Sequence, residues 1–260
     1  MAETIRVSID DRGVASLVLA RADKHNALSE QMMLELTEAI LDLGRDPAVR
    51  VVVLMADGKT FCAGGDLKWM QAQMGATPAE RAAGARVLAT MLQALNTCPK
   101  PVIGRVHGNA FGGGIGMMSV CDVAVGVEGA LFGLTETKLG LTPATISPYV
   151  VARMGEANAR RVFMSARLFG AVEARDLGLL AKVVAPEELD AAVEAEVVPY
   201  LKCAPGAVGE AKALVRMLGP RIDESVIDAT IAALVQRWES DESVEGISAF
   251  FEKRLPNWNM

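Results

Sequence analysis

The stretch FGGGIG, from Phe111 to Gly116, decides how this sequence is interpreted. A glycine inside a helix costs about 1 kcal/mol relative to alanine, so three glycines in succession need a physical reason. Glycine adopts backbone conformations that other residues avoid, and it lets another group approach the main chain closely. The stretch therefore predicts either a tight packing contact of a helix or a place where a ligand meets backbone N–H groups.

A second glycine-rich stretch, FCAGGDL (61–67), occurs earlier in the chain. Each stretch follows an apolar run that is typical of a strand buried on both faces, VVVLMA (51–56) and PVIGRV (101–106), and each leads into a segment with helical potential. The carboxyl ends of parallel strands meet at one edge of a sheet, where ligands bind. The first N–H groups of a helix lack backbone partners, so two such groups aimed at one point form an oxyanion hole.

Two familiar glycine motifs do not fit the sequence. A P-loop requires G-x-x-x-x-G-K-[ST], and no Lys-Ser or Lys-Thr follows either stretch. A dinucleotide-binding G-x-G-x-x-G that starts at Gly112 requires glycine at position 117, which is Met117. Close helix packing without a ligand stays open for either stretch alone, and the pair of stretches favours a binding site.

The remaining pattern predicts an α/β core. Alternating runs at 4–10 and 14–20 indicate a β-hairpin, and Ser29 is a suitable cap for the helix that follows. A second helix is expected over 78–97, and DVAVGV (122–127) repeats the pattern of a buried strand. Strands that alternate with helices are typical of a parallel sheet with crossover helices.

Beyond about residue 147 the sequence is mostly helical. We therefore expect a β/α core over residues 1–200 and a helical C-terminal region over residues 201–260. Two apolar stripes at helical spacing mark this region, Ile227, Ile231, Leu234 and Trp238 in the first and Val244, Ile247 and Phe251 in the second. They are expected to pack on the core of the chain, and packing across a subunit interface is the open alternative.

Composition excludes several classes of function. The 260 residues are 51% hydrophobic and carry a net charge of −6, which disfavours nucleic acid as a partner. No run of about 18 apolar residues predicts a membrane span, and the amino terminus has no signal-peptide pattern. The scattered cysteines and the two histidines predict no disulfide framework and no metal site, so we expect a cytoplasmic protein.

Glu136 is the candidate acid of the sequence. It lies in LTETKLG (134–140), a short polar segment with apolar neighbours that follows the predicted strand at 122–127. That position predicts that the carboxyl group reaches the same end of the sheet as the glycines. An ordinary surface glutamate is the alternative that the spacing alone leaves open.

Five motifs of this chain, taken together, resemble those of a known family. They are HNALS (25–29), FCAGGDL (61–67), VHGNAFGGGIG (106–116), CDVAV (121–125) and FGLTETKLGL (132–141). In order and spacing they resemble the crotonase superfamily, the enoyl-CoA hydratase/isomerase family. The resemblance implies an α/β fold, with a crotonase ββα spiral core and a helical C-terminal trimerisation region. It also implies an acyl-CoA thioester as substrate, a homotrimer or hexamer, and no cofactor besides the coenzyme A that is part of the substrate.

The resemblance also assigns roles to individual residues. The backbone N–H groups of Gly65 and Gly113 would form an oxyanion hole for the thioester carbonyl and so stabilise an enolate. Glu136 matches the catalytic glutamate of the family, which moves a proton at the substrate carbons. The substrate would further lie along Lys24, Ala27, Ala63, Asp66, Leu67 and Gly116.

Gly116 departs from the family pattern. Hydratases that use two acids carry a second glutamate here, so that one carboxylate activates water and the other handles the α-proton. Isomerases of the family, which shift a double bond, need only one glutamate. Two further segments, 134–155 and 249–258, resemble the methylglutaconyl-CoA and isohexenylglutaconyl-CoA hydratases of leucine and terpene breakdown. In that branch the substrate would bring its own carboxylate, with Lys138, Arg153 and Tyr149 as candidate partners.

We therefore expect an enzyme, an enoyl-CoA hydratase that acts on a 2-enoyl-CoA thioester through an enolate held in the oxyanion hole. A branched glutaconyl-CoA is the candidate substrate. Two alternatives stay open. One is a Δ3,Δ2-enoyl-CoA isomerase that uses a single glutamate, and the other is a non-catalytic protein that keeps the crotonase fold and the coenzyme A site.

Overall fold

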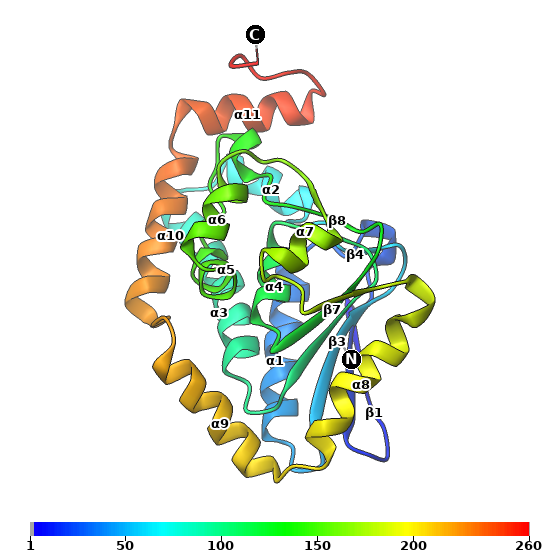
Figure 1. Cartoon of the computed structure of the whole chain (residues 1–260). Helices are drawn as coiled ribbons and strands as arrows, with labels where there is room; N and C mark the ends of the chain where they lie inside the picture. Colours follow the sequence, from blue (N-terminus) through cyan, green and yellow to red (C-terminus); the bar gives the residue numbers. More distant parts are fainter. Residues whose placement is uncertain (1–2, 260) are drawn as a thin grey trace.

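A six-stranded sheet forms the centre of the protein, of which the computed structural model describes residues 3–259 (Figure 1). The strands lie in the order β1-β2-β3-β5-β7-β10. β1 and β2 are antiparallel, and every later neighbour pairs in parallel. The strands are β1 (Ile5–Ile9), β2 (Val14–Leu19), β3 (Val51–Ala56), β5 (Val102–Val106), β7 (Val123–Val127) and β10 (Lys182–Val184).

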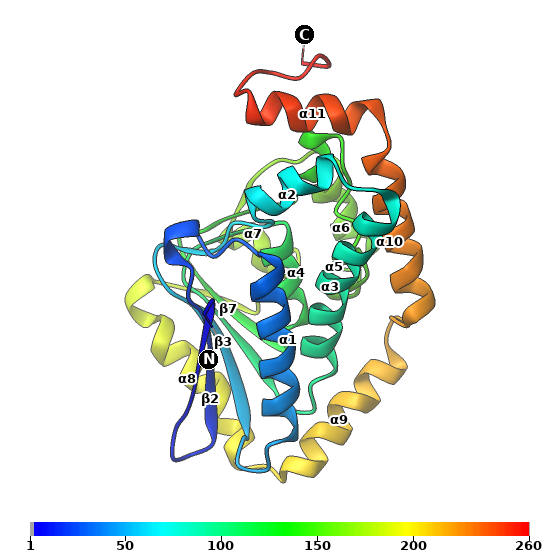
Figure 2. The same ribbon diagram turned by 180° about the vertical axis from the view of Figure 1, so that it is seen from behind.

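The predicted hairpin and the three predicted buried strands are confirmed. Ile5 pairs with Leu19 and Ile9 with Ala15, so the hairpin is formed by β1 and β2. β3 is an unbroken apolar run because both of its faces are covered. Figures 1 and 2 show α1 (Glu30–Arg45) on one face of the sheet and α8 (Leu189–Leu201) on the other.

A smaller sheet was not expected from the sequence. It contains β4 (Thr60–Cys62), β6 (Asn109–Phe111), β8 (Leu131–Gly133) and β9 (Phe169–Gly170), in that order. β4, β6 and β8 are parallel, and β9 is antiparallel to β8. Strands of two or three residues are too short to show an alternating pattern. The glycine-rich stretches and the segment with Glu136 follow the strands of this sheet, so it replaces the larger sheet as the element that brings them together.

Helices cover the sheets and connect their strands. Ser29 caps α1 by accepting from Met32 N, and Thr77 and Glu80 form a capping box at the start of α3, which confirms the helix predicted over 78–97. The other helices before residue 189 are α2 (Leu67–Met74), α3 (Pro78–Thr97), α4 (Gly113–Val120), α5 (Ser147–Met154), α6 (Glu156–Phe163) and α7 (Ala171–Asp176). Short 3₁₀ helices are η1 (Ala22–Lys24), η2 (Glu136–Leu139) and η3 (Pro186–Glu188).

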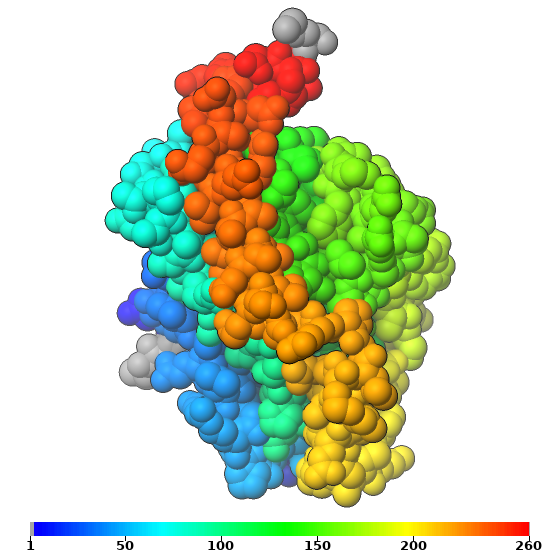
Figure 3. Space-filling model, turned by 90° about the vertical axis from the view of Figure 1, so that its left-hand side faces the viewer, coloured from blue at the N-terminus to red at the C-terminus, as the bar shows by residue number. Residues whose placement is uncertain are grey.

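Three C-terminal helices run along the outside of the core, α9 (Pro205–Leu218), α10 (Glu224–Trp238) and α11 (Asp241–Phe251) (Figure 3). The first predicted stripe is confirmed as a core contact, because Ile227 and Ile231 pack against Ala85 and Ala89 of α3. The division at residue 200 stays a prediction. No helix within residues 3–259 is both long enough and apolar enough to cross a membrane.

The core contact expected of the second stripe is found for Ile247 and not for Val244, for which packing across a subunit interface stays open. Val244 is 58% exposed, whereas Ile247 is 1% exposed. The face of α11 that meets the core carries Gly246 instead, because α11 lies directly against η2. A Cβ on Gly246 would lie 2.5 Å from the carbonyl carbon of Leu139.

The C-terminal helices therefore hold the turn that begins with Glu136. Besides the Gly246 contact, Arg237 Nε of α10 donates to the carbonyl oxygen of Gly140 at 2.9 Å. A Cβ on Gly140 would overlap the backbone of Glu242. The position of η2 depends on main-chain contacts that leave no room for larger residues.

Replacing Gly246 by alanine should lower the free energy of unfolding by about 1–3 kcal/mol, because the added methyl group overlaps the backbone of η2. Urea denaturation measures the effect. The matched control is Gly206→Ala in α9, where a Cβ meets nothing within 4 Å. That change should leave stability equal or raise it by up to about 1 kcal/mol. Equal effects of the two changes would contradict the contact.

Candidate active site

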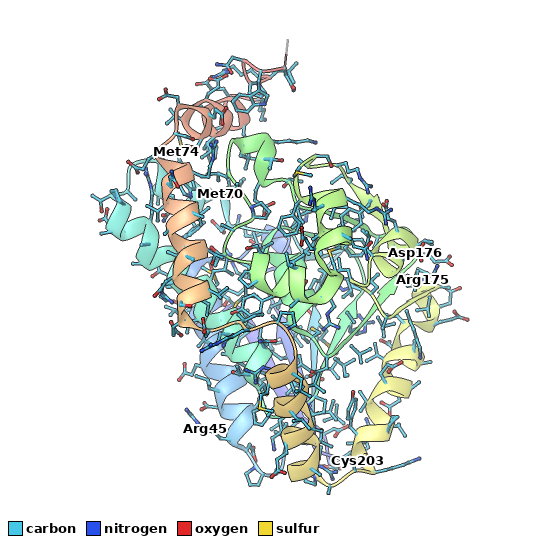
Figure 4. All side chains as sticks on the ribbon, turned by 60° about the vertical axis from the view of Figure 1, so that its left-hand side comes forward. Arg45, Met70, Met74, Arg175, Asp176 and Cys203 are labelled. Atoms are coloured by element: carbon cyan, nitrogen blue, oxygen red, sulfur yellow. The ribbon has the colours of Figure 1, made fainter. Side chains whose placement is uncertain are left out.

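A cavity of about 500 Å³ lies between the loops of the small sheet, α2 and the C-terminal helices. Most of its wall is apolar, and residues far apart in sequence contribute to it: Leu28, Trp69, Met70, Phe111, Leu141, Ile146, Leu234, Trp238 and Phe250. Figure 4 labels Met70 and Met74 on α2, on the side of the molecule where α10 passes. The polar groups on the wall are few, as is typical of a pocket that binds a largely apolar ligand.

The first glycine-rich stretch is held in place by the HNALS segment. Leu28 N donates to Gly64 O at 2.8 Å, and Asp66 N donates to Leu28 O at 3.0 Å. The buried side chain of Asn26 donates to the carbonyl oxygens of Asp57 and Thr60. Leu28 thus bonds to the carbonyl oxygen of Gly64 and the N–H of Asp66, the backbone groups on either side of Gly65. The N–H of Gly65 itself is left for another acceptor.

The second glycine-rich stretch makes the turn from β6 into α4. Gly112 has φ 47° and ψ −114°, a conformation that favours glycine. Its N–H donates to Gly133 O of β8, and α4 begins at the next residue. A Cβ on Gly113 would lie 2.6 Å from Leu28 Cδ1, and one on Gly114 would lie 2.8 Å from Cys62 O. A glycine is therefore required at each of the three positions, at Gly112 by its backbone conformation and at Gly113 and Gly114 by the lack of space for a Cβ.

The two stretches meet. A Cβ on Gly112 would lie 3.9 Å from the Cα of Gly64, and both Gly65 and Gly113 line the cavity. Gly113 is the first residue of α4, so its N–H has no partner within the helix. Within residues 3–259, neither the Gly65 nor the Gly113 N–H donates to a backbone acceptor. Two free donors on one cavity wall can bind a carbonyl oxygen or an oxyanion.

Glu136 lies against the second stretch. It is the first residue of η2, and its Oε1 would be 2.9 Å from a Cβ on Gly112. Its Oε2 is buried and has no hydrogen-bond partner among residues 3–259. Burial among apolar side chains raises the pKa of Glu136 to about 7, against a weaker opposing effect of its own backbone N–H. A carboxyl group with this pKa can accept and return a proton near neutral pH.

Gly116 is buried away from the cavity wall. A Cβ there would lie 2.7 Å from Ile146 Cγ2 and 3.5 Å from Leu92 Cδ1. The space beside residue 116 is therefore filled by apolar side chains. Any side chain at this position would need Ile146 to move, whereas the distance to Leu92 is an ordinary van der Waals contact.

The other predicted binding residues divide into two groups. Ala63 and Leu67 line the cavity with the glycines and Glu136. Asp66 does not; it caps α2 and its Oδ2 pairs with Arg21 Nη2 at 2.9 Å. Lys24 of η1 is exposed and Ala27 is buried, and neither lies on the cavity wall. Roles of these residues in binding coenzyme A stay predictions.

The structure distinguishes the three candidate partners for a substrate carboxylate. Lys138 is exposed and lines the cavity. The Arg153 guanidinium instead donates to carbonyl oxygens at the end of α4, among them that of Ser119. Tyr149 is buried and donates to Gln93 Oε1 at 3.1 Å. Lys138 is therefore the candidate whose charge can reach a ligand in the cavity.

Several wall residues were not identified from the sequence as parts of the site. Leu234 and Trp238 of α10 belong to the first predicted stripe, whose apolar spacing indicated burial without indicating a ligand, and Phe250 of α11 belongs to neither predicted stripe. Thr145 also lines the cavity, and nothing in its sequence context distinguishes it from other threonines. Within residues 3–259, no cluster of three or more His, Cys, Asp or Glu residues is arranged to hold a metal ion.

The sequence profile of the enoyl-CoA hydratase/isomerase family matches residues 10–260. The chain belongs to this family. It is 34% identical to the enoyl-CoA hydratase ACTT6 of Alternaria alternata over 259 residues, 97% of this chain and 82% of that protein. It is 32% identical to the crotonyl-CoA hydratase of Syntrophomonas wolfei over 255 residues, 94% of each chain.

Solved structures agree with this membership. The crystal structure of an enoyl-CoA hydratase from Mycobacterium avium superposes with a TM-score of 0.85 at 30% identity, over the full length of both chains. The α/β fold expected from the resemblance to the enoyl-CoA hydratase/isomerase family is thereby confirmed. The trimerisation region and the glutaconyl-CoA branch stay predictions.

Gly116→Ala should lower the free energy of unfolding by about 1–3 kcal/mol through overlap with Ile146. Ile146→Ala removes the nearest atom, so the same glycine change should cost at least about 1 kcal/mol less in that background. Urea denaturation of the four proteins of this double-mutant cycle measures the coupling. Additive effects would show that the space beside Gly116 is open.

The raised pKa of Glu136 predicts a dependence of stability on pH. The native carboxyl binds its proton more tightly than the unfolded one, whose pKa is 4.5. Between pH 4.5 and about 7 the stability of the wild type should therefore fall as pH rises, by up to about 1.4 kcal/mol per pH unit, relative to Glu136→Gln. Denaturation curves of both proteins at several pH values test this, and a constant difference between them would contradict the burial of a titrating acid.

Proposed function

We propose that this chain hydrates a 2-enoyl-CoA thioester, with Glu136 as the acid–base group and the N–H groups of Gly65 and Gly113 as the oxyanion hole. The observation that carries the proposal is the buried, unpartnered carboxyl oxygen of Glu136, which lines the same cavity as two free backbone donors. Membership of the family, and relatives named as hydratases, support the reaction class.

The proposed chemistry needs only these groups. Two N–H donors on the thioester oxygen draw electrons from the conjugated double bond and make C3 electrophilic. Glu136, ionised, takes a proton from water as the oxygen of that water bonds to C3. The enolate that results is held by Gly65 and Gly113, and Glu136 then returns the proton to C2. Coenzyme A is part of the substrate, and no other cofactor enters.

For the acyl group, we propose a branched glutaconyl-CoA. Its carboxylate would pair with Lys138, the cationic side chain on the cavity wall, and its branched hydrocarbon would contact the apolar residues of α2 and α10. The substrate acid would also compensate for the charge that two-acid hydratases carry at the position of Gly116. Breakdown of branched carbon skeletons such as that of leucine would supply this class of ester.

A single-glutamate isomerase is the second candidate. The packing of Ile146 and Leu92 around Gly116 favours it, because moving a double bond from C3 to C2 requires one base that removes and returns a proton. A non-catalytic protein that binds coenzyme A esters is the third. It is disfavoured by the pKa of Glu136, which is raised to about 7 and suits proton transfer near neutral pH.

A panel of coenzyme A esters separates these functions. With 2-enoyl esters, hydration removes the absorbance of the conjugated thioester, and we expect this result. With 3-enoyl esters, isomerisation creates the same absorbance. Glu136→Gln should lower kcat at least about 100-fold, and kcat/KM of the wild type should fall below a pH of about 7 because the base becomes protonated. Isomerisation alone, or binding without turnover, would overturn the hydratase.

Lys138→Gln tests the glutaconyl substrate. It should raise KM for the branched glutaconyl ester by about two- to fivefold, the effect of a solvent-exposed ion pair, and leave KM for crotonyl-CoA unchanged. Lys68→Gln is the matched control, because Lys68 is exposed on α2 and does not line the cavity. Fast turnover of crotonyl-CoA with no preference for the glutaconyl ester would rule this substrate out.

We further propose that the chain forms a homotrimer or hexamer in the cytoplasm. α9 exposes an unusually apolar surface, with Leu214, Val215, Met217 and Leu218 each more than half exposed. Large exposed apolar patches of this kind are typical of subunit contacts.

A further inference from the structure

Three buried side-chain atoms within residues 3–259 have no hydrogen-bond partner: His107 Nδ1, Glu136 Oε2 and Thr145 Oγ1. Two of them, on Glu136 and Thr145, belong to residues that line the same cavity. Buried polar groups are nearly always paired, with protein or with ordered water. Each of these two oxygens therefore lacks a partner, and a polar molecule in the cavity that both residues line can supply one.

Thr145 is firmly positioned for such a role. The residue is 4% exposed and lies two residues before the start of α5, next to the N-cap residue Ile146. On one side, Ala144 O accepts from Ser147 N at 3.0 Å and from Ser147 Oγ at 2.6 Å. On the other side, Ile146 O accepts from Val150 N at 3.1 Å. A β-branched side chain on a fixed backbone has few rotamers, which limits the directions that the hydroxyl can take.

Thr145 is also next to the residue that closes off position 116. The side chain of Ile146 fills the space that a Cβ on Gly116 would occupy, and glycine itself supplies no second carboxylate. A hydroxyl group does not take up a proton near neutral pH, but it accepts a hydrogen bond and so orients a donor. An ordered water needs two or more polar partners, and the carboxyl oxygen of Glu136 is only one such partner.

We propose that Thr145 Oγ1 and Glu136 Oε2 together hold the water molecule that is added to the substrate. The inference rests on the proposed hydratase function. The water donates one hydrogen to each oxygen, which leaves a lone pair of its oxygen free for C3. As the C–O bond forms, the C2–C3 π electrons move toward the thioester carbonyl, and the water proton passes to Glu136. Glu136 returns that proton to C2, and Thr145 keeps its own proton throughout.

The test compares two reactions of one site. Thr145→Val keeps the shape of the side chain and removes the hydroxyl, and Thr145→Ser restores it. The first reaction is hydration of the 2-enoyl-CoA that the wild type hydrates fastest. The second is exchange of the α-hydrogen of the corresponding saturated acyl-CoA in deuterated water, which uses Glu136 and the oxyanion hole but adds no water to carbon.

We expect Thr145→Val to lower kcat for hydration by about 10- to 100-fold, the effect of losing one hydrogen bond that orients the nucleophile, with KM within about threefold. The rate of α-hydrogen exchange should stay within about twofold of the wild type. Thr145→Ser should recover most of the hydration. The Tm of Thr145→Val should be unchanged or higher, because the change removes a buried polar atom without a partner.

Unchanged hydration in Thr145→Val would overturn the inference and leave the hydratase in place. Parallel loss of hydration and exchange with a lower Tm would show a structural hydroxyl and overturn it too. So would a rise of KM alone, confined to esters that carry a carboxylate, since the hydroxyl would then bind the substrate. Glu136→Gln should abolish both reactions, and a wild type that hydrates no 2-enoyl ester would overturn the proposed function together with this inference.

Discussion

The burial of one carboxyl group without a hydrogen-bond partner is the constraint on which the rest of this structure depends. An acid in apolar surroundings costs free energy, and in the described part of the chain no hydrogen bond compensates Glu136 Oε2 for its lost hydration. The turn that carries Glu136 would move toward water if it were free. It is held by the small sheet on one side and by α10 and α11 on the other, through contacts with the main chain of Leu139 and Gly140. The fold thus holds a group that is unfavourable by itself and that has a pKa suited to proton transfer.

The glycines of FGGGIG serve both of the purposes that such a stretch allows. Gly112 and Gly113 face the cavity, one beside Glu136 and the other against Leu28, so the main chain itself becomes part of the site. Gly114 and Gly116 face the protein interior, where Cys62 and Ile146 occupy the space of a side chain. A six-residue segment therefore joins a binding surface to a closely packed core. The glycine at 116, which is unusual for a two-acid hydratase, has a packing reason in this chain.

Hydrophobic periodicity and capping residues predicted the strands and helices that are long enough to show such patterns. The spacing of residues did not predict how these elements pack against one another. The buried strand at 51–56 could be predicted from the sequence because it is a continuous apolar run covered on both faces. The helix at 78–97 could be predicted because it is long enough to show helical spacing and a cap. The strands of the small sheet could not, although they bring the glycines and Glu136 together. The resemblance to a family indicated Gly65, Gly113 and Glu136. It gave no indication of Thr145, because an unpaired hydroxyl is a property of packing in three dimensions.

Contacts between the last helix and the turn of Glu136 have a consequence for when the candidate site is completed during synthesis of the chain. Leu28 and Phe250 line one cavity, and Gly246 supports η2 from the far end of the polypeptide. A ribosome that has made the central sheet has not yet made a working site, since more than one hundred residues separate Glu136 from the helix that steadies it. Nascent chains that end before α11 would therefore lack both the support of η2 by Gly246 and the part of the cavity wall that Phe250 forms.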